Sequence, residues 1–487
     1  RRARPPSIPA GTSHRTTNRR DPLAVSFDLV IRRGRLVDAD GTREADLGVR
    51  GGVISEIGAG LGNGGSEIDA AGRYVMPGGV DCHVHLDQVS SKGDMTADDF
   101  WTGSRSAVFG GTTTVVPFAA QHRGMSIRQV VDAALGRAGK QMTVDYGMHV
   151  IVTDFSGDAP AELASVAADG IAAVKIYLTY DRLKLNGVAA LDVMAAARDV
   201  GIPVMIHAEA DDLVTRNRDL QVAAGQLSAS SHAVSHSREA EYAGVAEAIA
   251  LGESSGATVY LAHVSTPEAI DLAIAARASG VEVIAETCPH YLLLDESTLD
   301  QPMEVAAPFL CSPPLRGAED RSGLLDRLAS GDIDLVTSDH SPYSLAQKLP
   351  NGPDTAFTEA ANGLPGIELR LALLYSAAVE EGHLDMPDFV RLVAANPAKA
   401  CGLFPRKGSL EIGADADLVI WSEQHHTGSW TDLHDNVGYT PYEGLELAGR
   451  PYAVISAGEV VVGADVDETR PGRGRFVARH GRTAAPR

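Results

Sequence analysis

The chain has 487 residues, of which 44% are hydrophobic, 22% charged and 5% aromatic. At roughly 100–200 residues per domain, this length predicts several domains, or one large α/β domain with an accessory domain. The formal charge of −22 argues against nucleic acid or an anionic membrane as a partner, because an acidic surface repels phosphate. The four cysteines, none in a CxxC spacing, are typical of reduced thiols and predict a cytoplasmic protein.

The two ends of the chain differ in composition from its middle. Residues 1–24 contain six arginines, one aspartate and several prolines, which predicts a disordered N-terminal extension. Short alternating β-rich runs broken by turn residues fill 25–76 and return in 405–469, so we expect these two pieces to pair into one small β-sandwich domain. Residues 470–487 are predicted to form a surface-lying C-terminal tail.

Residues 77–404 read as repeated βα units. The interpretation rests on eight apolar, β-rich runs that alternate with helix-period stretches, a pattern typical of parallel sheets. Eight such units predict an α/β fold, a (β/α)8 TIM barrel. A doubly wound open sheet is the alternative, but no GxGxxG motif follows an early strand to favour it. The runs are 74–80, 112–118, 144–152, 171–177, 202–206, 258–262, 281–285 and 333–337.

Potential metal ligands follow several of these strands. His83 and His85 leave the first strand two residues apart, so their side chains point the same way in an extended chain. His207, His263 and Asp339 follow the fifth, sixth and eighth strands. Catalytic residues of such barrels gather where the strands end. Imidazole and carboxylate groups are ligands of zinc and similar metals, so the pattern predicts a metal site.

The fourth strand carries a lysine, Lys175, inside a buried apolar run. An ammonium group there is unfavourable unless it is paired or chemically changed. It could pair with a buried acid, or form a Schiff base as in aldolases. The third interpretation is carboxylation by CO2, which converts the cation into an anionic carbamate able to bridge two metal ions.

Taken together, these motifs resemble the hydantoinase/dihydropyrimidinase branch of the cyclic amidohydrolases, within the amidohydrolase superfamily. The resemblance covers about 27–477 and implies a barrel with a β-sandwich built from both chain ends. The stretches that carry it include GGVDCHVHLD, VKIYLTY, MIHAEA, LAHVS, ETCPHYLLL, CSPPLR, TSDHSPY and NGLPGIELR.

The resemblance implies a centre of two divalent metal ions per chain. Zinc is the usual metal of the family, and manganese or iron could use the same ligands. N6-carboxylation of Lys175 by CO2 would supply one bridge between the ions, and a hydroxide the other. The implied ligands are His83, His85 and Asp339 for the more buried ion, and His207 and His263 for the more exposed one.

The same resemblance implies a mechanism. The metal-bridging hydroxide attacks the amide carbonyl of a hydantoin, dihydropyrimidine or related cyclic imide or ureide and opens the ring. Tyr180 would stabilise the developing oxyanion, and Asp339 would carry the proton to the leaving nitrogen. Ser312 and Asn362 resemble the residues that hold the amide edge of the ring.

Some positions depart from the family pattern and leave the substrate open. The polar stretch 87–93 replaces an apolar pair of the hydantoinases, and His290 resembles the allantoinase form, so an allantoinase-like ureide hydrolase is an alternative. Asp87 stands where dihydroorotases carry an arginine. A non-catalytic dihydropyrimidinase-related binding protein is a second alternative, but such relatives have lost metal ligands, and all six ligand positions are filled here. A single-metal deaminase is a third alternative, but it would not need Lys175. A homotetramer is implied by analogy.

Overall fold

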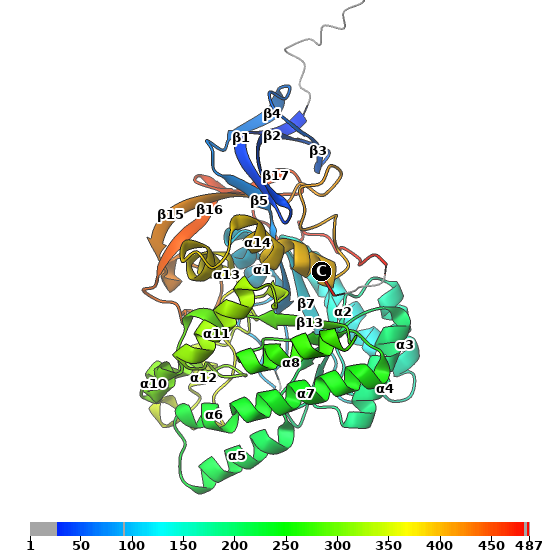
Figure 1. Ribbon diagram of the computed structural model, residues 1–487, viewed down its shortest axis with the longest axis vertical. Coiled ribbons are helices and arrows are strands. Elements are labelled where there is room, and N and C mark those ends of the chain that lie inside the picture. The colour runs from blue at the N-terminus through cyan, green and yellow to red at the C-terminus, as the bar shows by residue number, and fades with distance from the viewer. Residues whose placement is uncertain (1–26, 91–92, 482–484, 487) are drawn as a thin grey trace, which may run out of the picture.

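The computed structural model describes residues 27–90, 93–481 and 485–486, so the predicted extension 1–24 lies outside the described residues. Its strands form two sheets, one from the middle of the chain and one from both ends, stacked along the long axis in Figure 1. No helix in the described part of the chain is both long and apolar enough to cross a membrane.

The middle of the chain forms a parallel sheet that curls into a barrel, which confirms the predicted fold class. The strands pair in chain order from β6 to β14, with β8 attached to β7. A parallel bridge between Val84 and His340 joins the first strand to the segment after the last. The strands are β6 Gly79–Val84, β7 Thr112–Ala120, β8 Asp145–Tyr146, β9 His149–Ile151, β10 Val174–Tyr177, β11 Val204–His207, β12 Val259–Leu261, β13 Val283–Thr287 and β14 Leu335–Val336.

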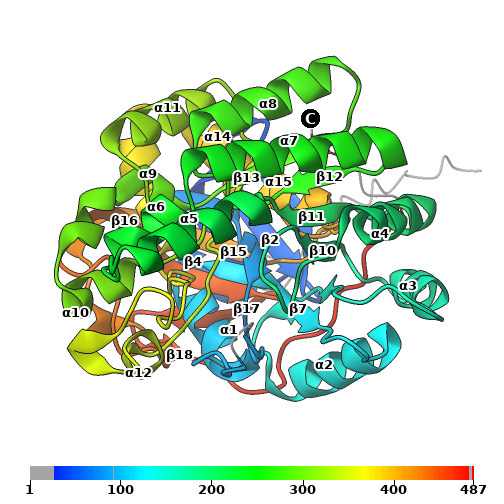
Figure 2. The same ribbon diagram turned by 90° about the horizontal axis from the view of Figure 1, so that it is seen from below.

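Helices surround this sheet, as Figure 2 shows from below. The helices cover the outer face of the strands and the barrel encloses the inner face, so that every residue of β10 to β14 is buried. The helices following the strands are α1 Phe100–Phe109, α2 Ile127–Gln141, α3 Ala159–Ala168, α4 Gly187–Val200, α7 Arg238–Ser255, α8 Pro267–Ala278 and α11 Ala318–Ala329. Insertions and the C-terminal side add α5 Asp211–Ala223, α6 Ser230–Ser235, α9 Pro289–Leu293, α10 Met303–Ala306, α12 Leu345–Lys348, α13 Arg370–Leu374, α14 Met386–Val390 and α15 Asn396–Ala400.

The two chain ends share one mixed nine-stranded sheet, as expected. Strand β5 pairs antiparallel with β15, with Pro77 opposite Leu418. On the side away from β2, β1 pairs with β4 along its first half and with β5 along its second. The strands are β1 Phe27–Asp38, β2 Gly41–Arg50, β3 Val53–Gly58, β4 Gly64–Asp69, β5 Tyr74–Pro77, β15 Leu418–Thr427, β16 Glu446–Ser456, β17 Glu459–Gly463 and β18 Val466–Asp467.

The predicted first strand, 74–80, is divided between the two sheets. Strand β5 ends at Pro77 in the terminal sheet, and β6 begins at Gly79 in the barrel. The chain crosses at Gly78, where a Cβ atom would lie 2.0 Å from Oγ1 of Thr113. Any larger residue at this position would collide with Thr113 of the barrel strand β7, so the crossing requires glycine.

Residues 470–481 run across the end of the barrel opposite the strand exits. Val477 is only 1% exposed, and Arg479 donates hydrogen bonds to the carbonyls of Ile171 (2.9 Å) and Val200 (3.0 Å). This part of the predicted tail is therefore packed against the barrel rather than lying free on its surface.

A buried lysine connects the barrel to the terminal sheet. Nζ of Lys407 lies 2.7 Å from Asp145, 2.9 Å from Asp415 and 2.5 Å from Asp417. These three carboxylates are close enough together to hold a metal ion, but the Lys407 ammonium already contacts all three, and Arg406 and Arg475 pair with two of them. We interpret the cluster as a structural ion-pair network.

Candidate metal centre

The six predicted ligands meet at one end of the barrel, where the strands leave the sheet. The first two share the end of one strand, Lys175 lies within β10, and the others come from the ends of three further strands; all line a single cavity of about 90 Å³. Every one of them is almost completely enclosed, with at most 9% of the residue exposed. They are His83, His85, Lys175, His207, His263 and Asp339.

One group of ligands is formed by His83, His85 and Asp339. Oδ1 of Asp339 lies 3.3 Å from Nε2 of His83 and 3.4 Å from Nε2 of His85. Two ligand atoms that each bind one zinc ion at ~2.1 Å in a tetrahedron are themselves ~3.4 Å apart. The three atoms therefore already have the spacing that a divalent ion requires.

A second group is formed by the two remaining histidines. Nδ1 of His207 and Nε2 of His263 face each other at 3.0 Å. The imidazole of His263 also stacks against that of His83, with ring centroids 5.4 Å apart, so the two groups of ligands adjoin.

Lys175 lies between the two groups. Its Nζ is 3.4 Å from Nε2 of His83, and the residue is 1% exposed. Within the described residues it forms no direct ion pair, although the buried carboxylates of Glu286 and Asp339 are near enough to attract its charge. Burial lowers the pKa of the Lys175 ammonium to about 8, so the neutral amine is far more populated than in an exposed lysine.

The protonation of the other ligands also suits a metal. Burial lowers the pKa values of His85, His207 and His263, and metals bind the neutral form of imidazole. Burial alone would raise the pKa of Asp339, but the imidazoles beside it, above all His83, lower it well below its usual range. The carboxylate is therefore ionised at neutral pH.

Three of the four histidines donate their second ring N–H to a side-chain oxygen. Such contacts orient a ligand and fix the nitrogen that faces the metal. Sequence reasoning missed these partners, although a signal was present: Glu209 follows His207 with the spacing that separates the first two histidines. The pairs are His83 Nδ1 with Glu286 Oε1 (2.8 Å), His85 Nδ1 with Gln88 Oε1 (2.9 Å) and His207 Nε2 with Glu209 Oε2 (2.6 Å).

The other predicted site residues, Tyr180, Ser312 and Asn362, line the same cavity. Tyr180 has a left-handed backbone, with φ 73°, and burial raises the pKa of its phenol, so it stays a hydrogen-bond donor at neutral pH. Oδ1 of Asn362 is buried and has no hydrogen-bond partner among the described residues. An unpaired buried acceptor in a cavity is suited to a ligand that donates an N–H group.

The cavity adjoins a larger outer chamber of about 540 Å³. Tyr180 and Asn362 line both spaces, so they stand where the chamber meets the metal centre. Most of the residues that line the chamber are polar or charged, among them Arg182, Asp211 and Arg218.

A parallel barrel with histidines, a lysine and an aspartate gathered at the strand exits defines a metal-dependent barrel hydrolase. Residues 74–461 match the amidohydrolase family model. The chain is 37% identical over 455 residues to a D-hydantoinase of Ralstonia pickettii, covering 93% of this chain and 99% of that one. It is 35% identical to a D-phenylhydantoinase of Escherichia coli O1:K1 over 456 residues, covering 93% and 98%.

Solved structures agree with these sequence matches. A D-hydantoinase (dihydropyrimidinase) from Thermus sp. superposes with a TM-score of 0.90 at 34% identity, covering 94% of this chain and 100% of that one. An L-hydantoinase (dihydropyrimidinase) from Arthrobacter aurescens gives a TM-score of 0.85 at 26% identity, covering 93% and 100%. The chain belongs to the amidohydrolase family, and it is a cyclic amidohydrolase of the hydantoinase/dihydropyrimidinase type.

Proposed function

We propose that this enzyme opens a hydantoin, a dihydropyrimidine or a related cyclic imide or ureide at a centre of two divalent ions. The observation that carries the proposal is the convergence of six buried ligands on a small cavity that is also lined by Asn362, whose Oδ1 has no partner among the described residues. Zinc is the proposed metal. Bound there, two divalent ions would supply hydroxide at neutral pH and polarise the substrate carbonyl.

The ligand groups suggest how the ions are shared. His83, His85 and Asp339 would hold the more buried ion, because their ligand atoms already cluster. His207 and His263 would hold the more exposed one. Lys175 stands between the groups, and only its neutral amine can react with CO2 to form the proposed bridging carbamate. Its depressed pKa supports that modification.

Substrate would be held from the opposite side of the cavity. Asn362 Oδ1 and the segment around Ser312 would bind the N–H and carbonyl groups of the ring's amide edge. The Tyr180 phenol would donate to the carbonyl oxygen as negative charge develops on it. Asp339, ionised beside two imidazoles, would accept a proton from the nucleophile and return it to the departing ring nitrogen.

The site offers little support for the allantoinase-like alternative. His290, the residue that suggests it, is 1% exposed and is not among the residues lining the cavity in which the ring would bind. The adjoining chamber of about 540 Å³ instead leaves room for a substituent on the ring.

The proposal is tested by a turnover panel of hydantoin, 5-phenylhydantoin, dihydrouracil, allantoin and succinimide with zinc-loaded enzyme. We expect ring opening of at least one of the first three. Turnover of allantoin alone would favour the alternative, and no turnover of any of the five would contradict the proposal. A homotetramer in the cytoplasm is the proposed setting, and light scattering of the purified chain tests the assembly.

Replacing Tyr180 by phenylalanine removes one hydroxyl and little volume. Loss of a single oxyanion donor typically lowers kcat about 10²–10³-fold. We expect a loss of that size with unchanged metal content, measured by steady-state kinetics on the best substrate of the panel. The matched control is Tyr242→Phe, because Tyr242 is 47% exposed on α7. Full activity of the Tyr180 variant would remove this residue from the mechanism.

A further inference from the structure

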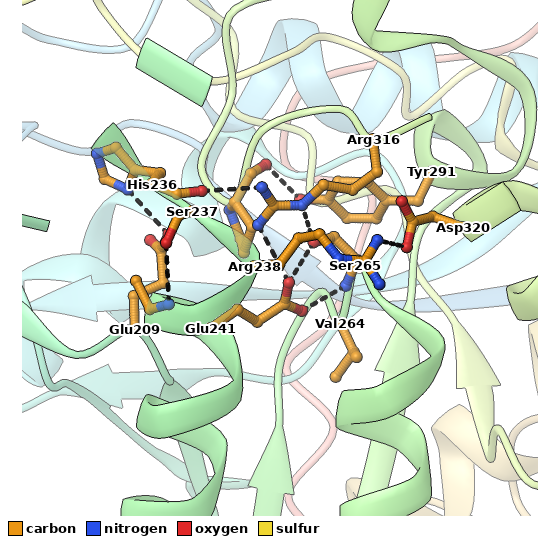
Figure 3. A network of polar contacts seen from close by, with 12 residues as sticks. Glu209, His236, Ser237, Arg238, Glu241, Val264, Ser265, Tyr291, Arg316 and Asp320 are labelled. Atoms are coloured by element: carbon orange, nitrogen blue, oxygen red, sulfur yellow. Dashed lines mark hydrogen bonds and ion pairs between the residues drawn. The ribbon is translucent and has the colours of Figure 1, made fainter. Parts of the chain in front are cut away.

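Glu209 is a carboxylate behind the proposed exposed-metal subsite, and the role inferred for it rests on the proposed two-metal function. Glu209 is fully buried and accepts hydrogen bonds from two different imidazoles. Nε2 of His207 donates to Oε2 at 2.6 Å, and Nδ1 of His236 donates to Oε1 at 2.9 Å. Figure 3 shows the second of these contacts, with Glu209 below the ring of His236.

The first contact decides which nitrogen of His207 is available to a metal. A neutral imidazole carries one proton, and the carboxylate holds that proton on Nε2. The lone pair is then on Nδ1, the atom that faces Nε2 of His263 at 3.0 Å. Glu209 thus selects the tautomer that the exposed-metal subsite needs.

The exposed-metal subsite has no other support of this kind. Both histidines of the buried-metal group donate to a side-chain oxygen. Nδ1 of His263, by contrast, is buried without a hydrogen-bond partner among the described residues. Of the two exposed-site ligands, only His207 therefore has its second ring nitrogen held by a side chain, and that side chain is Glu209.

The position of His236 is itself fixed by a buried arginine. Arg316 donates to the carbonyl oxygen of His236 (2.9 Å), to Oγ of Ser265 (3.0 Å) and to Glu241 (3.2 Å), and it stands at the centre of the contacts in Figure 3. Arg316 is 5% and Glu241 2% exposed, so this network is shielded from water. Ser265 lies two residues after His263, which brings the network to both histidines of the subsite.

We propose that Glu209, braced by His236, is a positioning residue that secures the more exposed metal ion by holding His207 in its binding tautomer and orientation. His236 also lines the outer chamber, so a ligand bound in the chamber could contact the residue that braces Glu209. Removal of such a partner typically weakens metal binding about 10–100-fold. The loss should fall on one ion, since the buried-metal histidines keep their own partners.

The test is metal retention by Glu209→Gln. A glutamine has the same shape, but its one oxygen can accept from only one of the two imidazoles, and its NH2 group opposes the other N–H. Zinc-loaded proteins are dialysed against a series of dipicolinate concentrations, and zinc is counted by elemental analysis. We expect a range in which wild type holds two ions per chain and the variant holds one. The control is Glu268→Gln. Glu268 lies on α8, its side chain is 53% exposed and pairs with Arg238, and this variant should hold two zinc ions per chain.

A second pair of variants keeps the test decisive if Glu209→Gln misfolds. In His236→Asn the side-chain amide replaces the Nδ1–H donor, whereas His236→Leu removes it. We expect the asparagine variant to retain the second ion more strongly than the leucine variant, with similar melting temperatures.

Each outcome has a distinct meaning. If Glu209→Gln releases zinc as wild type does, or loses both ions together, the positioning role is wrong although the proposed function stands. Equal retention by the two His236 variants would also overturn it. If active wild-type enzyme holds fewer than two ions, the two-metal proposal itself fails.

Discussion

Lys175→Ala is expected to abolish turnover. The variant removes the proposed bridge between the ions, and metal activation of water and carbonyl contributes several kcal/mol to the reaction. At ~1.4 kcal/mol per factor of ten, the expected loss is about 10³-fold or more. The measurement is kcat/KM on the best substrate of the panel, with the exposed Lys140→Ala on α2 as the control.

Restoring the activity of Lys175→Ala with an added carboxylic acid would show that Lys175 acts as a bridging anion and not only as a structural residue. Alanine leaves space beside His83, and a short-chain carboxylic acid could occupy it and replace the carbamate. We expect acetate or propionate to restore part of the activity of Lys175→Ala and to have no such effect on wild type. Wild-type activity of the variant without any acid would contradict the bridging role.

Asp339→Asn is expected to give the second large loss. Asparagine keeps the shape of the side chain but cannot take up a proton, and it is a weaker metal ligand. Loss of the proton transfer alone typically costs about 10²–10⁴ in kcat. The comparison is kcat of the metal-analysed variant with that of Asp271→Asn, which is 50% exposed on α8 and should behave as wild type. A variant within threefold of wild type would exclude Asp339 as the proton carrier.

Much of the barrel could be predicted because its strands are buried on both faces. A continuous apolar run is then favoured along each strand, and 204–206 and Val259–Leu261 show it in the sequence. Helix α5 could not be found in this way. All its residues but Val214 are exposed or half-buried, so its sequence has no continuous apolar stripe.

The ligand set could be predicted for a related reason. Parallel strands bring their ends to one rim, so residues such as His207 and His263, distant in sequence, are placed together by topology alone. The residues that hydrogen-bond to these ligands are harder to predict from the sequence. His236 reaches Glu209 from the segment between α6 and α7, through packing that no spacing in the sequence records. Sequence motifs therefore locate the centre, whereas the contacts that hold it require the structure.

The proposed mechanism requires two metal ions in one cyclic amidohydrolase site. Reconstitution of the metal-free enzyme with zinc tests this requirement most directly. Enzyme freed of metal with dipicolinate is titrated with Zn2+ in bicarbonate buffer while ring opening of 5-phenylhydantoin, or the best substrate of the panel, is followed. We predict no activity without metal and a rise that reaches its plateau at two equivalents per chain. Full activity in the metal-free protein, or a plateau at one equivalent, would contradict the two-metal centre.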